Sequence, residues 1–493
     1  MRSFPTSRRL AGTMPVWFPV AIVAAWVGLA AMLNSSQFLD NIEQYVWAHG
    51  MVWGYWKHPP LPTFLIAALI RAFGPSVYWS YALAAVCFGG TALFTWKIAD
   101  RIIGSRLAAV AVLLLGLQLN FSWRAQIYNH NSVLILLVSA AVWSALVAAH
   151  DRRSGAWLLT GTLAGLAMLT KYQAVVPLLG LLGALWLSGA FKVRSNVIGA
   201  ILAVLVAALV FSPHLHWLVT NDFAPFTYAS KSVQHLPLSR RFGTLARFLF
   251  TELRMLFPGI VCLGLFALYV KRRPAVMEGA AGMEHDVAAI DEKPWMLMLI
   301  GFPLLFLSGM ALFGGMHLEG HWTLQTFQFL PIWLAQRIGR RCPRLDVRRF
   351  WHAAILVHVV SMASYVLAMT GPARSTAPGN DRAYPAKALA DMIVADWKKV
   401  TTCPLKYVVG PSFEAGMISV YSGLSPAVLE EGDFHKSPWV EPSDLARSGA
   451  LYVERSPRPS AFQGEMATPP RIIGAATKTT IYWTVVPPAS TCQ

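Results

Sequence analysis

The sequence predicts an all-α polytopic membrane protein of about eleven transmembrane helices with a small C-terminal α/β domain. The first observation is composition, because the 493 residues are 55% hydrophobic and only 13% charged, with a mean hydropathy of +0.48. Soluble globular chains do not reach these values. The second is a change near residue 372, where long apolar runs give way to short strand patterns between polar turns. We therefore predict a membrane domain over 1–371 and a separate domain over 372–493.

The apolar runs mark the membrane spans, because about 20 apolar residues cross a bilayer as a helix. The runs lie at roughly 14–33, 76–97, 106–122, 132–149, 155–171, 173–191, 195–217, 244–270, 294–313, 322–337 and 350–371. The run 322–337 is the weakest, because Gln325 and Gln328 interrupt it. The stretch 61–73 is only about 13 residues long, so we expect a short interfacial helix there. The first run is too long for a signal-peptide core, and we expect an uncleaved span.

The distribution of Lys and Arg supports this order of spans, because short cytoplasmic loops are rich in basic residues. With the N terminus inside, most basic clusters fall in inside loops. The loops 34–75, 123–131, 218–243 and 314–321 and the tail then face outside. We expect a multi-pass protein of the bacterial inner membrane that contacts membrane lipids. Its N terminus would be cytoplasmic and its C-terminal domain periplasmic. The pI of 9.9 does not indicate a nucleic-acid partner, since the basic clusters are short and dispersed.

The C-terminal segment predicts a mixed α/β domain. The residue patterns favour one amphipathic helix and three short strands, at 384–400 and at 407–410, 449–453 and 480–486. Cys403 and Cys492 bracket this segment, and in an oxidising periplasm they would form a disulfide. The other three cysteines have no metal-ligand spacing and are expected to be free thiols.

The stretch after the first span is the most informative part of the chain. It reads DNIEQYVWAHGMVWGYWKHPPL from Asp40 to Leu61, with acids, a lysine, histidines and several aromatics in one outer loop. Polar groups at a membrane face are costly and usually functional. We predict that this loop holds the reaction centre.

The loop resembles the first outer loop of GT-C glycosyltransferases, most closely the bacterial members related to protein mannosyltransferases and to the aminoarabinose and galacturonic acid transferases of lipid A (glycosyltransferase families 39 and 83). In these proteins the loop begins with an acid, continues through paired aromatics and ends in G-Y-x-x-H-P-P. Asp40 matches the acid, and Tyr45 and Trp47 lie in the aromatic stretch. The motif's end is matched by Gly54, Tyr55, His58, Pro59 and Pro60.

The resemblance implies a GT-C type fold and transfer of a sugar from a polyprenyl-phosphate donor, with inversion at the anomeric carbon. The implied acceptor is lipid A or lipopolysaccharide core, followed by a protein Ser/Thr or another envelope glycan. Asp40 would accept the acceptor's proton, or orient the acceptor if that group is a phosphate. The alternative is that Asp40 caps the loop helix. Asn41 stands where a second acid is usual, and Glu43, one helical turn from Asp40, offers a nearby carboxylate.

Cations and hydrogen-bond donors are needed near the leaving phosphate, on which negative charge increases. The outside-facing candidates are His58, Lys57, Arg124 and Lys171, of which Lys171 in LTKYQ matches a family lysine that resembles a phosphate contact. A lysine at a helix end is also commonly an interfacial snorkeller, and a histidine before proline can simply pack in a turn. Both alternatives stay open at this point.

Further substrate contacts are predicted in the outer loops. They are Tyr45, Tyr55, His130, Asn131, His317, Glu319 and His321. Interfacial aromatic belts explain the tyrosines almost as well. The His-x-Glu-x-His pattern also allows a zinc site, and a solvated loop is a third interpretation. The second outer loop contains no acid, which argues against a divalent metal held by carboxylates and leaves no cofactor certain.

Two functions from other classes compete with an enzyme. A lipid or glycan transporter would place ionisable groups near the bilayer midplane, whereas here they gather in outer loops. A scaffold in an envelope complex would tolerate the substitution Asp40→Asn. The distribution of polar residues favours the glycosyltransferase.

Overall fold

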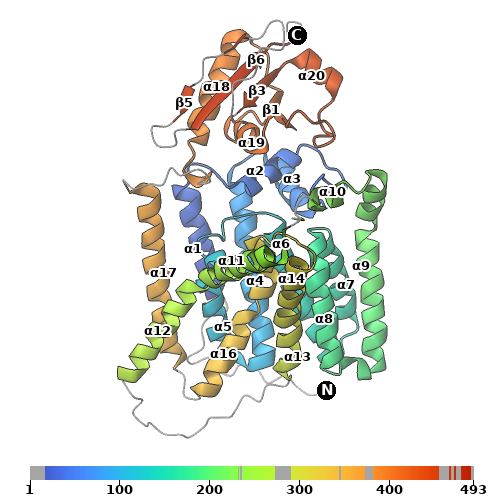
Figure 1. Cartoon of the computed structure of the whole chain (residues 1–493), viewed down its shortest axis with the longest axis vertical. Coiled ribbons are helices and arrows are strands. Elements are labelled where there is room, and N and C mark those ends of the chain that lie inside the picture. Colours follow the sequence, from blue (N-terminus) through green and yellow to red (C-terminus); the bar gives the residue numbers. More distant parts are fainter. Residues whose placement is uncertain are drawn as a thin grey trace.

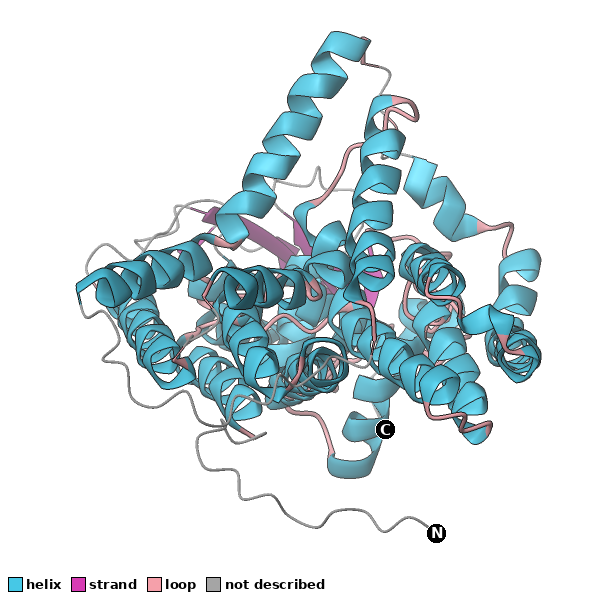
Figure 2. Ribbon diagram, turned by 90° about the horizontal axis from the view of Figure 1, so that it is seen from below, coloured by secondary structure: helices cyan, strands magenta, loops and turns pink. Residues whose placement is uncertain are grey.

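The structure is a computed structural model that describes residues 17–230, 233, 236–272, 290–342, 346–371, 381–454, 466–467, 471–473 and 479–489. A bundle of helices forms one layer, and a small domain with a sheet covers one end of that bundle (Figure 1). Seen along the bundle from the opposite end, the sheet lies behind the helices (Figure 2). The structure therefore contains a helical bundle and a small domain with a sheet, and the boundary at residue 371 stays a prediction.

The helices of the bundle coincide with the predicted apolar runs. They are α1 (Phe18–Leu33), α4 (Tyr78–Ile103), α5 (Ser105–Leu117), α6 (His130–His150), α7 (Gly155–Met168), α8 (Val175–Leu187), α9 (Arg194–Thr220), α11 (Leu238–Met255), α12 (Phe257–Arg272), α13 (Glu292–Met296), α14 (Phe302–Leu312), α16 (Leu330–Arg341) and α17 (Val347–Thr370). Within the described residues, five helical stretches are long and apolar enough to cross a membrane, and the bent pair α11–α12 would be a sixth. The other apolar helices are shorter, so the count of about eleven stays a prediction.

Two predicted spans are broken. The run 244–270 is not one straight helix, because α11 and α12 meet at a bend of 53°. Polar residues on α11 such as Arg247 and Glu252 make it amphipathic, and it runs across the bundle (Figure 1). The run 322–337 is divided between α15 (Leu324–Phe327) and α16, around the buried Gln325 and Gln328.

The outer loop forms two short helices at the end of the bundle that faces the small domain (Figure 1). These are α2 (Leu39–Trp47) and α3 (Leu61–Phe73), and α3 is the short helix expected at 61–73. Leu61 N donates a hydrogen bond of 3.0 Å to Leu169 O at the end of α7. This bond joins the end of the loop to the segment that carries Lys171.

The C-terminal domain is a mixed sheet with helices. Its described strands are β1 (Tyr407–Gly410), β2 (Ala427–Glu430), β3 (Ala450–Glu454), β4 (Met466–Ala467), β5 (Arg471–Ile473) and β6 (Thr479–Val486), in the order β2-β1-β3-β6-β4, with β5 paired to β6. Its helices are α18 (Ala386–Val400), α19 (Ser412–Tyr421) and α20 (Pro442–Ser448). β1 pairs in parallel with β2 and β3, and β6 runs antiparallel to β3. The predicted helix and three predicted strands agree with α18, β1, β3 and β6 to within two residues.

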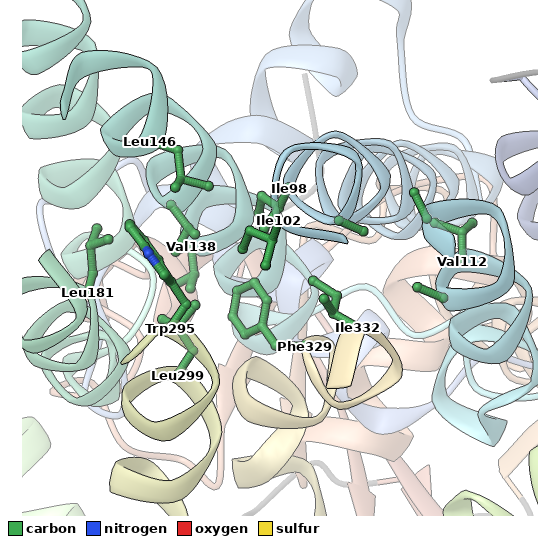
Figure 3. Close-up of a cluster of buried hydrophobic side chains, with 14 of the residues drawn as sticks. Ile98, Ile102, Val112, Val138, Leu146, Leu181, Trp295, Leu299, Phe329 and Ile332 are labelled. Carbon is green, nitrogen blue, oxygen red and sulfur yellow. The ribbon is translucent and has the colours of Figure 1, made fainter. Parts of the chain in front are cut away.

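Two hydrophobic cores organise the molecule. One lies inside the bundle, where Trp295 and Phe329 meet Ile98 and Ile102 from a distant part of the sequence (Figure 3). The other is shared by the outer loop and the C-terminal domain, since Ile42 and Val46 of α2 belong to the same cluster as side chains of α18, α19 and the sheet. Burying apolar surface in this shared core fixes α2 against the C-terminal domain.

The contact between α2 and α19 is close. A Cβ atom added at Gly416 of α19 would lie 2.4 Å from Ile42 Cγ2, so only glycine allows this approach. Among the cysteines, Cys87, Cys262 and Cys342 are free as expected, and Cys403 is disulfide-bonded. Its predicted partner, Cys492, lies outside the described residues.

Candidate active site

A cavity of about 620 Å³ lies between α2, the start of α6, the connection from α7 to α8, and the short helix α10 (Ala224–Ser230). The segment from Met316 to Trp322 closes its far side. Most of the predicted site residues line it together. They are Asp40, Glu43, Lys57, His58, His130, Asn131, Lys171, Glu319 and His321. The fold thus brings five separate segments of the sequence to one cavity.

Asp40 lies in the first turn of α2 and is partly exposed to the cavity. Asn129 Nδ2 donates a hydrogen bond of 2.6 Å to Asp40 Oδ2. Asn129 itself is fixed, because its side chain caps α6 and accepts hydrogen bonds from the backbone of Asn131 and Ser132. Within the described part of the chain, Asp40 Oδ1 has no hydrogen-bond partner. The carboxylate is therefore oriented at one oxygen and available at the other.

The capping alternative for Asp40 is wrong. The N-cap of α2 is Phe38, and the first backbone N–H of the helix, at Leu39, donates a hydrogen bond of 3.1 Å to Asp381 Oδ2 and not to Asp40. Asp40 still benefits from its place in the first helical turn, where the helix dipole favours a negative charge.

Glu43 and Lys57 form a buried ion pair beside the cavity. The Lys57 ammonium also lies 4.5 Å from the centre of the Trp56 ring and 5.7 Å from that of Tyr228. Burial raises the pKa of Glu43 to about 7, although the Lys57 charge opposes this. Burial opposes the charged form of Lys57, but the Glu43 carboxylate more than compensates and raises the pKa of Lys57. Lys57 is thus a fixed cation, whose partner titrates near neutral pH.

His58 and His130 lie beside each other, with ring centroids 4.2 Å apart and the ring planes tilted by 43°. The Trp47 ring packs against both, at 6.5 Å from His58 and 5.8 Å from His130. Burial, followed by the neighbouring His130, lowers the pKa of His58 well below its ordinary value. His58 is therefore neutral at physiological pH. His130 Nε2 is buried and has no hydrogen-bond partner in the described part of the chain, so it offers an unmet polar atom at the cavity.

Lys171 is held inside the cavity wall. It is 8% exposed, and its Nζ donates a hydrogen bond of 2.9 Å to Asn131 Oδ1. The same ammonium lies 5.7 Å from the centre of the Trp322 ring. An interfacial snorkeller would extend toward headgroups and water, so the structure contradicts that alternative.

Other predicted residues lie elsewhere. Tyr45 donates a hydrogen bond of 2.8 Å to Ser76 O and lines a second cavity of about 790 Å³, beneath α18 and α19. Tyr55 is 2% exposed, stacks on Trp47 at 4.8 Å and donates to Gly50 O. Both tyrosines hold the loop together, and the structure places neither on the cavity that contains Asp40.

The predicted residues of the segment 316–322 lie in different surroundings. His321 faces the cavity, where burial and then the charge of Lys171 lower its pKa to about 3. His317 points outward and is 46% exposed, 3.7 Å from Glu319. Among the residues that the structure describes, no three His, Cys, Asp or Glu side chains form a group that would hold a metal ion. The zinc alternative thus has no assembled ligand set here.

Comparisons with known proteins support the GT-C resemblance. Residues 57–217 match the family of dolichyl-phosphate-mannose-protein mannosyltransferases. Over 95% of its length, the chain superimposes on 98% of ArnT from Cupriavidus metallidurans bound to undecaprenyl phosphate, with a TM-score of 0.62 and 14% sequence identity. The chain has the GT-C fold. The apo state of the same ArnT aligns with a TM-score of 0.52, at 16% identity over 94% of this chain and 97% of that one.

A curated relative matches part of the chain. Lipid A galacturonosyltransferase RgtD of Rhizobium johnstonii is 30% identical over 191 residues, which is 38% of this chain. The match spans 39% of the relative's length.

Three features of this site were missed from sequence. Tyr228 of α10 lies beside Lys57, and Asn129 orients Asp40. Glu252 of α11 is 1% exposed, and its Oε2 accepts a hydrogen bond of 2.5 Å from Thr323. Its Oε1 has no partner within the described residues, and its charge acts on Arg124. The signal for Glu252 was present, because an acid inside the apolar stretch FLFTELRM is costly without a role.

Arg124 does not line this cavity. Its side chain is exposed, and the charges of both Asp40 and Glu252 act on it. Its guanidinium makes no hydrogen bond among the described residues, and the charge of Arg382 acts on it together with those of the two carboxylates. Of the predicted phosphate contacts, Lys57, His58 and Lys171 therefore line the cavity, and Arg124 does not.

Proposed function

We propose that this chain is a membrane glycosyltransferase that moves one sugar from a polyprenyl-phosphate donor to lipid A, lipopolysaccharide or another envelope acceptor. The observation that carries this proposal is the cavity in which Asp40, a half-satisfied carboxylate, shares one wall with the fixed cations Lys57 and Lys171. A proton acceptor beside cations is the arrangement that transfer from a phosphate leaving group requires.

The reaction would use these groups as follows. The acceptor oxygen forms a bond to the anomeric carbon while the bond from that carbon to the phosphate oxygen breaks. Asp40 takes the proton of an acceptor hydroxyl at Oδ1, and Asn129 keeps Oδ2 in place. Lys171, Lys57 and Arg124 stabilise the negative charge that increases on the phosphate. His58 is neutral and contributes as a hydrogen-bond donor, not as a charge.

Several findings support the choice of donor and acceptor. The structural neighbour ArnT is described with undecaprenyl phosphate bound, and the curated relative is a lipid A galacturonosyltransferase. The cavity lies at the bundle end that adjoins the C-terminal domain (Figure 1). We assign this end to the periplasmic face of the inner membrane, where the basic loops predict it. The mannosyltransferase family match favours a protein Ser/Thr as the second acceptor to test.

The test compares cells that lack this gene with the same cells complemented by the wild-type chain. Envelope glycolipids and glycoproteins of both strains are analysed by mass spectrometry. We expect one lipid A or core species to lose the mass of a single sugar without the gene and to regain it with the wild type. The lost mass identifies the donor sugar and the species identifies the acceptor.

Two outcomes would contradict the proposal. A loss confined to glycopeptides would replace the lipid acceptor with a protein. An unchanged set of glycans, together with a donor lipid that accumulates on one leaflet, would favour a transporter.

A further inference from the structure

The C-terminal domain reaches the outer loop through one buried carboxylate. Glu430, at the end of β2, is fully buried. Its Oε2 accepts hydrogen bonds from two indoles of the loop, 2.9 Å from Trp47 Nε1 and 3.3 Å from Trp56 Nε1. Its Oε1 accepts a hydrogen bond of 2.6 Å from Ser412 Oγ in its own domain. One carboxyl group therefore connects the domain to both tryptophans.

The two tryptophans in turn contact the groups that line the cavity. Trp47 packs against the neighbouring rings of the pair His58 and His130. Trp56 lies beneath the Lys57 ammonium, 4.5 Å from its ring centre. A second cation beside Trp56 comes from the C-terminal domain, because Lys436 Nζ lies 4.6 Å from the centre of the same ring. The indole that fixes Lys57 is thus held by Glu430 and Lys436.

This connection is costly to break. A buried charge is tolerated only where hydrogen bonds satisfy it, and here two of the three side-chain donors come from the loop. Each indole N–H donates once, so loss of the carboxylate would leave the buried donor of Trp47 and the part-buried donor of Trp56 unsatisfied. The tryptophan rings would then have no hydrogen bond to the domain, although the Lys436 ammonium beside Trp56 and the shared core around Ile42 and Val46 would remain.

We propose that Glu430 is a positioning residue of the donor site, through which the C-terminal domain sets Trp47 and Trp56 and thereby holds Lys57 and the histidine pair against the phosphate of a polyprenyl phosphate. The proposal rests on the proposed function for the identity of that ligand. The proposal gives the C-terminal domain a part in donor binding. The sequence does not reveal this part, because the domain lies far along the chain from the residues that line the cavity.

The test measures the affinity of the purified full chain for undecaprenyl phosphate, together with thermal unfolding and sugar transfer in membranes. For Glu430→Ala we expect the affinity for undecaprenyl phosphate to fall about tenfold, which corresponds to about 1.4 kcal/mol of binding free energy. For Glu430→Gln we expect a change below about threefold, because the amide oxygen still accepts both indoles and the amide nitrogen can donate to Ser412.

Two matched variants separate positioning from stability. Ser412→Ala removes a hydrogen bond to the same carboxylate without touching the loop, so it should lower the unfolding temperature and leave affinity unchanged. Asp444→Ala, in the same domain and bound to Tyr407 and Lys406, should behave like wild type in binding. In a Trp56→Phe background, Glu430→Ala should cost less affinity than in wild type, since the two act through one contact.

The outcomes distinguish the two proposals. If Glu430→Ala folds and binds undecaprenyl phosphate as wild type does, the positioning role is wrong while the glycosyltransferase stands. If affinity falls in the same proportion for Ser412→Ala and Glu430→Ala, Glu430 is structural only. If the binding pattern holds but no sugar is transferred by wild type, the inference survives and the proposed reaction fails.

Discussion

The two acid–base pairs near the cavity differ in how far the fold buries them. Glu43 and Lys57 are 8% and 15% exposed, whereas Glu319 and His317 are 55% and 46% exposed and lie 3.7 Å apart. The C-terminal domain and α10 cover the first pair. In the second pair Glu319 lines the cavity, whereas His317 does not. An exposed pair contributes at most about 1 kcal/mol, while a buried one is costly to break. The covered side of the cavity is therefore built for fixed geometry.

The strongest test of this contrast is Asp40→Asn, on the covered side. We expect the rate of sugar transfer to fall by about 10²- to 10⁴-fold, because the amide cannot accept a proton as the carboxylate does. The unfolding temperature should change little, since the amide oxygen can still accept from Asn129. Transfer by purified protein in proteoliposomes measures the rate.

A control variant at the opposite end of the bundle is Asp151→Asn. Asp151 pairs with Arg101 at 2.7 Å on the surface, and its loss should leave transfer unchanged. A rate for Asp40→Asn within about threefold of wild type would remove the carboxylate from the chemistry, because general acid–base catalysis contributes more than this.

The next effect concerns stability and its dependence on pH. In Lys57→Met, Glu43 loses its cation, and at pH 8 we expect a loss of about 3–5 kcal/mol, as for other broken buried pairs. The pKa of Glu43 is raised to about 7, above its ordinary value of 4.5. Its contribution to stability is therefore full below pH 4.5 and is lost as the pH rises through 7. Thermal unfolding in detergent at pH 5 and pH 8 measures this.

Glu43→Gln is the matched control, because the amide fills the same space and does not titrate. Its unfolding temperature should lack the decline that wild type shows between pH 5 and pH 8. An equally steep decline in Glu43→Gln would assign the pH dependence to another group.

These residues show what sequence could and could not predict. Asp40, His58 and Lys171 were predicted because polar residues at an apolar boundary are costly and because they match positions of the family motif, and the fold places all three on one cavity. The pairing of Glu43 with Lys57 was not predicted, because it depends on burial by α10 and by a domain whose Glu430 lies 374 residues after Trp56 in the sequence. Tyr45 and Tyr55 were assigned to substrate because an aromatic stretch does not reveal which rings pack inward.

The fold was predicted in the same way and with the same limit. Apolar length located the helices, and alternation located β1, β3 and β6. The break between α11 and α12 was missed because the run 244–270 was judged by its overall hydropathy. That average combines an amphipathic helix with an apolar one. The sharing of one core between α2 and the C-terminal domain requires tertiary contacts that no local pattern contains.

Lys171 tests whether a fixed cation in the wall acts on the donor. We expect Lys171→Met to weaken binding of undecaprenyl phosphate by about 10- to 100-fold, the value of a hydrogen bond to a charged group. Asn131 loses its partner but remains next to the cap of α6, so the fold should persist. Lys192, at the other end of the bundle, supplies the control Lys192→Met, which should bind as wild type does. Equal affinities for both variants would place the phosphate elsewhere.

The smallest effect is expected in the segment 316–322. In its motif His-x-Glu-x-His the two histidines look equivalent, but in the fold they have different surroundings. His321 faces the cavity, whereas His317 is exposed beside Glu319. We expect His321→Ala to slow sugar transfer about tenfold and His317→Ala to change it by less than about twofold, as for a surface substitution. Transfer rates of the two variants measured in parallel check this. A loss as large for His317→Ala as for His321→Ala would mean that the exposed pair takes part in the reaction, and the division of the cavity into a fixed and a tolerant side would not hold.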